Sequence, residues 1–186
     1  RFPTVALAPL LPETLRWDGW INGEVDFTTT GDGPDGRLFL DAGEGQFQLL
    51  VDGEWESLAY NTLTSEVALK PNQADLAVRL SGPELGDFTL DMNLDPNSDD
   101  RNVEGSFSLE GLDIALAGLL SGLDEVAGRV NGHGQLSGPL MKPAVTGELH
   151  LVNGRVSDPR LPVPIEEVIA SVQFGGYSAE ISGRIR

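Results

Sequence analysis

Residues 75–95 read DLAVRLSGPELGDFTLDMNLD, and this stretch decides the fold. Apolar and polar residues alternate before and after Ser81-Gly82-Pro83, a tripeptide typical of a turn. Because successive side chains of a β-strand point to opposite faces, period two predicts a half-buried strand on each side of the turn. The two strands are expected to form an antiparallel hairpin with one apolar face and one face that carries acidic residues.

The same period continues along most of the chain, which predicts an antiparallel meander and a single β-rich segment over residues 1–186. Turn residues interrupt the alternation at short spacing, as hairpins require. They lie at 31–36, 52–53, 81–83, 95–97, 138–139 and 153–154. Two Ala- and Leu-rich stretches depart from period two, and they predict short helices at 5–11 and 114–120.

An internal repeat relates the two parts of the chain. Residues 5–11 align with 114–120, and at the same offset 19–23 align with 128–132, so the repeat joins approximately 5–23 with 114–132. A smaller five-residue unit also recurs, with glycine at its centre, an apolar residue at each end and any residue between them. The glycine falls on the apolar face, where it permits curvature or close packing. Such repetition predicts an extendable array. Because the sequence opens on Arg1 and ends within an alternating pattern, we expect a segment of a longer chain.

One face of the predicted sheet is almost purely aliphatic, and something has to cover it. Either two sheets pack into a sandwich, or one sheet curls into a trough whose interior stays open to an apolar ligand. The repeat, the glycines and the open ends favour the trough. Its candidate lining residues are Phe27, Leu38, Leu40, Leu49, Val51, Val67, Leu69, Leu76, Val78, Leu80, Phe88, Leu90, Met92, Leu94, Phe107, Leu109, Val130, Leu149, Leu151, Phe174 and Ile181.

Composition disfavours several functional classes. The formal net charge of −17 makes nucleic acid and anionic membrane surfaces poor partners. The chain has no cysteine and two histidines, which is too little for a thiolate or His-rich metal site. The sequence contains no motif of a hydrolase, metalloprotease or phosphate-binding loop, so we expect neither an enzyme nor a bound cofactor.

Two weaker signals in the sequence favour structural interpretations. Asp95, Asn97 and Asp99 match the first, third and fifth places of a calcium loop, but the required glycine and glutamate are absent from places six and twelve. A solvated acidic turn is favoured there, with weak calcium binding left open. His133 and His150 are predicted to be exposed strand residues, because the adjacent sequence supplies no acid that defines a catalytic pair.

The second half of the chain resembles a known family. The stretches LDIALAGLL at 112–120, VAGRVNG at 126–132 and LSGPLMKPAVTGELHLVNGRV at 136–156 are similar to the TamB family of the AsmA-like superfamily. The resemblance is clearest over residues 109–186, and it places the segment in the C-terminal part of a much longer chain.

This resemblance implies a fold and a cellular setting. Members of the family form a long antiparallel sheet curled into a U-shaped trough, or β-taco, with an apolar interior, so we expect an all-β fold with one or two short helices. The resemblance also implies a periplasmic segment of a protein anchored in the bacterial inner membrane by an N-terminal helix outside this sequence. Its implied partner is TamA, an outer-membrane barrel of the Omp85 family.

Three functions remain open at this point. The trough could carry phospholipid acyl chains between the inner and outer membranes, with no preference for head group or chain length. It could instead be a chaperone-like module that shelters autotransporter or outer-membrane protein strands by adding them to a free edge. A purely structural spacer with a closed core would need neither an open lining nor a free edge.

Overall fold

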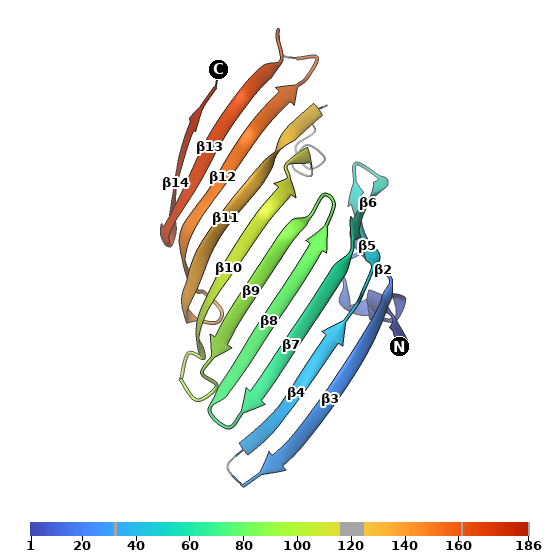
Figure 1. The fold of residues 1–186 in the computed structure, drawn as a ribbon, viewed down its shortest axis with the longest axis vertical. Coiled ribbons are helices and arrows are strands. Elements are labelled where there is room, and N and C mark those ends of the chain that lie inside the picture. Colours follow the sequence, from blue (N-terminus) through green and yellow to red (C-terminus); the bar gives the residue numbers. More distant parts are fainter. Residues whose placement is uncertain (32, 116–124, 161, 186) are drawn as a thin grey trace.

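The fold is that of a computed structural model, which describes residues 1–31, 33–115, 125–160 and 162–185. Antiparallel strands make up an eleven-stranded sheet and a three-stranded sheet (Figure 1). Within the described residues, no helix has the length and apolarity needed to cross a bilayer.

The large sheet contains most of the chain. From β7 onward each strand pairs with the next one in the sequence, so the predicted meander is confirmed there. The first and last strands of the sheet do not pair with each other, and the sheet stays open at both edges. In spatial order its strands are β1 (Phe2–Pro3), β3 (Trp20–Thr30), β4 (Gly33–Asp41), β7 (Thr62–Lys70), β8 (Gln73–Gly82), β9 (Gly86–Leu94), β10 (Asn102–Asp113), β11 (Glu125–Pro139), β12 (Ala144–Ser157), β13 (Ile165–Gly176) and β14 (Ser178–Arg184).

The small sheet continues three strands of the large one around a corner. Its order is β2 (Leu15–Asp18), β5 (Gly45–Val51) and β6 (Glu54–Tyr60). Strand β2 leads into β3 through Gly19, β5 follows β4 after residues 42–44, and β6 leads into β7 through Asn61. Because β3, β4 and β7 are neighbours in the same order, the small sheet forms a second wall beside the large one, and we call it the wall.

Tyr60 fills the corner between the wall and the large sheet. Its side chain is 1% exposed, and the Trp17 Nε1–H donates a hydrogen bond of 2.8 Å to its hydroxyl oxygen. The Phe47 ring packs with its centroid 5.1 Å from that of Tyr60. A Cβ on Gly45 would overlap the Tyr60 hydroxyl, so the corner requires glycine at this position. Besides Tyr60, the buried apolar side chains of the described residues are those of Ala42, Leu58 and Val103.

The N-terminal segment packs onto this corner as a short helix. The predicted helix at 5–11 is confirmed as a 3-10 helix, η1 (Thr4–Leu10). Thr4 is buried, and its Oγ1 donates a hydrogen bond of 2.8 Å to the Trp17 carbonyl. The second predicted helix, at 114–120, extends into residues outside the described ranges.

Two predicted turns have different outcomes. Asp52 and Gly53 both have positive φ, 50° and 89°, in the tight hairpin between β5 and β6 that their sequence predicts. The turn predicted at Asn153-Gly154 is wrong, because β12 continues through both residues. The pairing with β13 shifts register between Leu151 and Gly154, and Asn153 takes φ 54°, so this dipeptide forms a β-bulge.

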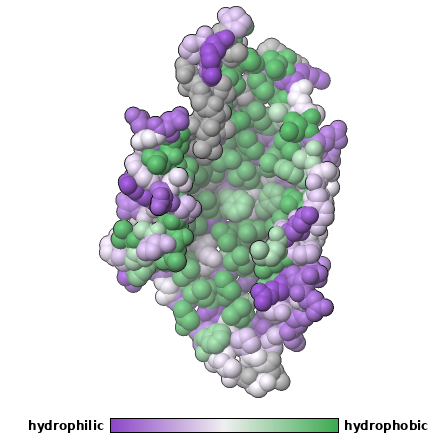
Figure 2. All heavy atoms as spheres, turned by 180° about the vertical axis from the view of Figure 1, so that it is seen from behind, coloured by the Kyte–Doolittle hydropathy of each residue, from purple (hydrophilic) through white to green (hydrophobic). Residues whose placement is uncertain are grey.

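The large sheet is curled, and its concave face is apolar. Figure 2 shows a continuous hydrophobic hollow with hydrophilic atoms along both sides. The wall borders one side of this hollow, and the turns at one end of the strands border the other (Figures 1 and 2). The predicted all-β trough is therefore confirmed, and we call the concave face of the large sheet the floor.

Candidate functional site

Strand register aligns apolar side chains across the floor. Cross-strand partners at equal height form continuous rows, because each paired residue points to the same face as its partner. Three such rows contain one polar side chain, that of Ser65. They are Val25, Leu38, Val67, Leu76, Met92, Gly105, Leu136 and Val145; Leu40, Ser65, Val78, Leu90, Phe107, Gly134, Gly147 and Phe174; and Leu63, Leu80, Phe88, Leu109, Gly132, Leu149, Val172 and Ile181.

The structure distributes the candidate lining residues over two surfaces. Leu49 and Val51 lie on β5 and belong to the wall, whereas all the others lie on strands of the large sheet. The register adds floor positions that were not among the candidates, although the same alternation marks them. These positions include Leu63, Val103, Leu112, Leu136, Val145 and Val172.

Floor side chains are only partly buried. The candidate lining residues are half-buried except Phe27 and Ile181, which are 53% and 75% exposed on strands near the two edges of the sheet. A closed sandwich would bury this face, as burial of each large apolar side chain contributes about 1.5–3 kcal/mol. A contiguous apolar surface of this kind is typical of a site that contacts an apolar ligand or partner.

Large side chains of adjacent strands fill the space above the glycines of the floor. The Phe107 ring lies over Gly134, where an added Cβ would approach within 2.6 Å of ring atoms. The Phe27 ring lies over Gly36 in the same manner, at 2.8 Å. Large side chains therefore lie flat across the glycines of adjacent strands. This packing explains why the recurrent glycines fall on the apolar face.

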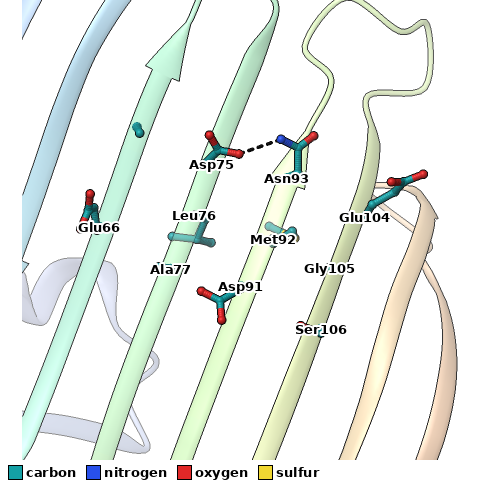
Figure 3. Close-up of a pocket in the computed structure, with 11 residues that line it drawn as sticks. Glu66, Asp75, Leu76, Ala77, Asp91, Met92, Asn93, Glu104, Gly105 and Ser106 are labelled. Atoms are coloured by element: carbon teal, nitrogen blue, oxygen red, sulfur yellow. Dashed lines mark hydrogen bonds between the residues drawn. The ribbon is translucent and has the colours of Figure 1, made fainter.

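The convex face has the opposite character. A shallow depression of about 450 Å³ lies there over β7 to β10 (Figure 3). Small residues at Ala68 and Ala77 leave the space, and carboxylates surround it. The carboxylates are those of Glu66, Asp75, Asp91 and Glu104.

Three of these carboxylates are engaged by side chains of neighbouring strands. Arg37 Nε lies 2.7 Å from Glu66, and Arg79 contacts both oxygens of Asp91 at 2.7 and 2.8 Å. The pKa of Asp75 is lowered by hydrogen bonds from the side chains of Gln73 and then Asn93, the latter at 2.7 Å (Figure 3). These contacts join β4 to β7 and β8 to β9 on the convex face, and they occupy three of the four carboxylates around the depression.

Two side chains of the acidic turn after β9 make hydrogen bonds. Asp95 Oδ1 accepts a hydrogen bond of 2.9 Å from the Asn97 N–H, and Asn97 Nδ2 donates one of 2.9 Å to Asn72 Oδ1. The described residues contain no cluster of three or more His, Asp or Glu side chains arranged for a metal ion. Weak calcium binding by Asp95, Asn97 and Asp99 stays a prediction.

The two histidines lie on the convex face, away from the floor. His133 is exposed, as predicted, whereas His150 is half-buried and has an acidic neighbour that the sequence analysis did not identify. Its Nε2 lies 3.2 Å from Glu148 Oε1, and its Nδ1 lies 2.9 Å from Ser171 Oγ.

The chain is similar to the proteins of one known family. The family model for the N-terminal domain of TamB matches residues 1–151. The chain belongs to the TamB family. Translocation and assembly module subunit TamB of Haemophilus influenzae is 25% identical over 153 residues, which is 76% of this chain and 12% of that relative. No solved structure matches the chain.

The match corrects one expectation about position within the TamB family. The resemblance placed the segment in the C-terminal part of a longer protein, but the matching model is that of the N-terminal domain, and it includes the first half of the chain. The unit of apolar residues and glycine recurs within this sequence, so a short motif of this kind indicates the family and not the position within it.

Proposed function

We propose that this chain is part of a periplasmic bridge whose trough carries phospholipid acyl chains between the inner and outer membranes. The observation that supports this proposal most directly is the floor, whose apolar rows run from β3 to β14 with their side chains accessible. Membership of the TamB family is consistent with a role in a translocation and assembly module.

The proposed mechanism follows from the chemistry of the floor. Apolar burial is non-directional and contributes about 0.8 kcal/mol for each CH₂ group removed from water. An acyl chain that slides from one strand to the next exchanges one aliphatic contact for another and meets no charged side chain in the three floor rows. The head group stays in water at the side of the trough. The floor would therefore accept acyl chains of different lengths.

The setting of this bridge is also part of the proposal. The chain spans 12% of the length of the H. influenzae relative, so most of such a protein lies beyond it. We place the inner-membrane anchor in that remainder, and we place the contact with the outer-membrane partner TamA there or at a sheet edge. The open edges of the large sheet support this arrangement, because further strands can add to either side.

A second candidate function has its own supporting observation. Among the described strands, β14 pairs only with β13, and all seven of its residues are exposed. Beyond Ile21, β3 likewise pairs only with β4 among the described strands. Free edges are templates for an added strand, so autotransporter or outer-membrane protein clients could bind there.

Photocrosslinking in cells tests the two candidates. A photoreactive residue replaces Leu90 in the full-length protein, and the adducts are identified by mass spectrometry. Leu90 lies in the middle of the floor, between Val78 and Phe107. Ser106 is the matched control, because it lies one strand away on the convex face and is exposed.

Each result assigns a function. Phospholipid adducts at Leu90 and not at Ser106 would support the conduit. Adducts with outer-membrane proteins at Leu90 would favour the chaperone-like module. Adducts formed only within the protein itself would contradict the conduit, since the floor would then be covered by another part of the chain.

A further inference from the structure

The turns at one end of the strands form a connected rim along the trough (Figure 1). The turn after β7 joins the loop after β9 through Asn72 and Asn97. That loop joins the turn after β11 through the Leu140 N–H, which donates a hydrogen bond of 3.2 Å to the Arg101 carbonyl. The Tyr177 hydroxyl then donates one of 3.3 Å to the Lys142 carbonyl. We call these turns, at 71–72, 95–101, 140–143 and 177, the turn rim.

Charges of both signs lie side by side on this rim. The loop after β9 carries three exposed carboxylates, those of Asp95, Asp99 and Asp100. Arg101 follows them directly, and Lys142 lies on the adjoining turn, with both side chains exposed. The loop begins immediately after Leu94 of the floor, so these charges lie along one side of the trough.

The conformation of this loop is fixed by its own hydrogen bonds. Ser98 Oγ donates to the Asp95 carbonyl at 3.1 Å and accepts the Asn102 N–H at 2.7 Å. The Arg101 N–H donates to the Ser98 carbonyl at 3.0 Å, and Arg101 adopts φ 48°, which is uncommon for a residue other than glycine. The positions of the acidic and basic residues are therefore held relative to each other.

The remaining charge of the molecule opposes an anionic ligand. Several other cations already contact carboxylates, as in the pairs of Arg37 with Glu66, Arg79 with Asp91 and Arg155 with Glu166. The wall ends in the exposed carboxylates of Asp52 and Glu54. Because the chain has a formal net charge of −17, an anionic head group would approach the trough against a repulsive field.

We infer that the trough selects phospholipids by head-group charge, and that zwitterionic head groups bearing an ammonium group bind at the turn rim in preference to net anionic ones. This inference rests on the proposed conduit function. The phosphate lies toward Arg101 and Lys142, and the ammonium lies toward Asp95, Asp99 and Asp100. The acyl chains occupy the floor beyond Leu94. The floor accepts any chain, so the rim is where lipids are discriminated.

The test compares two lipids that differ only in head group. Purified full-length protein carrying the photoreactive residue at Leu90 is mixed with vesicles containing equal amounts of phosphatidylethanolamine and phosphatidylglycerol with identical acyl chains. We expect phosphatidylethanolamine adducts to exceed phosphatidylglycerol adducts at least threefold in about 0.1 M salt. The ratio should fall toward one in about 1 M salt, because the screening length shrinks from about 10 Å to about 3 Å.

Two triple variants distinguish the effect of the rim carboxylates on lipid preference from the effect of the overall charge. Replacing Asp95, Asp99 and Asp100 by asparagine should abolish most of the preference, while Asp95→Asn keeps the oxygen that accepts the Asn97 N–H. The control variant Glu24→Gln/Asp87→Asn/Glu180→Gln removes three exposed charges from the convex face and should retain the preference. Equal loss in both variants would overturn the role of the rim.

The outcomes distinguish this inference from the function on which it rests. If the protein with the unmodified rim labels phosphatidylglycerol as much as phosphatidylethanolamine, or more, the selectivity is overturned and the conduit is left intact. Absence of adducts with either lipid would overturn the conduit and the selectivity together.

Discussion

Leu90 and Val103 show that exposure differs between positions of the floor. Both are apolar strand residues on the concave face, but Leu90 is half-buried and Val103 is 1% exposed. We expect Leu90→Asp to lower the free energy of unfolding by about 1 kcal/mol, because the carboxylate reaches water. The same change at Val103 buries an unpaired charge and should lower it by roughly 3 kcal/mol or more.

Urea denaturation of the two variants checks this prediction, with the unmodified protein as reference. If Leu90→Asp were as destabilising as Val103→Asp, the floor would be a covered core in solution. The open trough would then be contradicted.

Asp75 gives a prediction about pH. Hydrogen bonds from Gln73 and Asn93 lower its pKa below the ordinary value of 3.8, so the folded protein favours the ionised carboxylate. Its contribution to stability is fully present above that ordinary value and is lost as pH falls through the lowered folded pKa. Urea midpoints of the unmodified protein and Asp75→Asn should therefore converge as pH falls below about 4. Parallel profiles down to pH 2 would contradict the assignment.

The corner between the wall and the large sheet depends on Tyr60. In Tyr60→Phe the ring remains, but the buried Trp17 N–H loses the hydroxyl that accepts its hydrogen bond. We expect the free energy of unfolding to fall by about 1–2 kcal/mol. Hydrogen exchange should become faster in β2, β5 and β6 and stay unchanged in β11 to β14, which lie far along the sheet. Uniform faster exchange over all strands would show that the corner is not a separate local unit.

Most strands could be predicted from the sequence because each carries its own signal. Alternation identifies a strand from a few neighbouring residues, and Asp52-Gly53 identifies a tight hairpin. The wall could not be found in this way. Its strands alternate like the others, and their separation from the large sheet depends on Tyr60 packing against Gly19 and Gly45, which are distant in sequence.

The candidate site was partly predictable for the same reason. Period two selects the correct face of each strand, but it does not show which strands share a sheet, and Leu49 and Val51 were therefore grouped with the floor although they belong to the wall. The dipeptide Asn153-Gly154 has turn composition, yet pairing on both sides of β12 continues the strand and leaves a bulge. Long-range pairing outweighed the local signal in both cases.

On the scale of the whole molecule, the order of the strands divides the floor into successive positions, one for each strand. Among the described strands of the large sheet, each strand from β3 to β13 pairs with one strand on either side, so a lipid that travels along the trough crosses every strand in turn. A conduit of this kind fails wherever it is interrupted. A binding module with a free edge tolerates interruptions that lie away from that edge.

Single charges placed at separate points along the floor therefore distinguish the two functions. We expect Leu38→Asp on β4, Leu90→Asp on β9 and Leu149→Asp on β12 each to reduce phospholipid passage at least tenfold, because a carboxylate at any step opposes the acyl chain. The double variant Leu38→Asp/Leu149→Asp should be no worse than either single variant, since one block in a series already stops the flow. The measurement is transfer of isotopically labelled phospholipid between the membranes of cells that depend on this protein, with Glu104→Ala on the convex face as control. Partial, additive losses, or a loss confined to the variant nearest the β14 edge, would contradict the conduit and favour a set of independent binding positions.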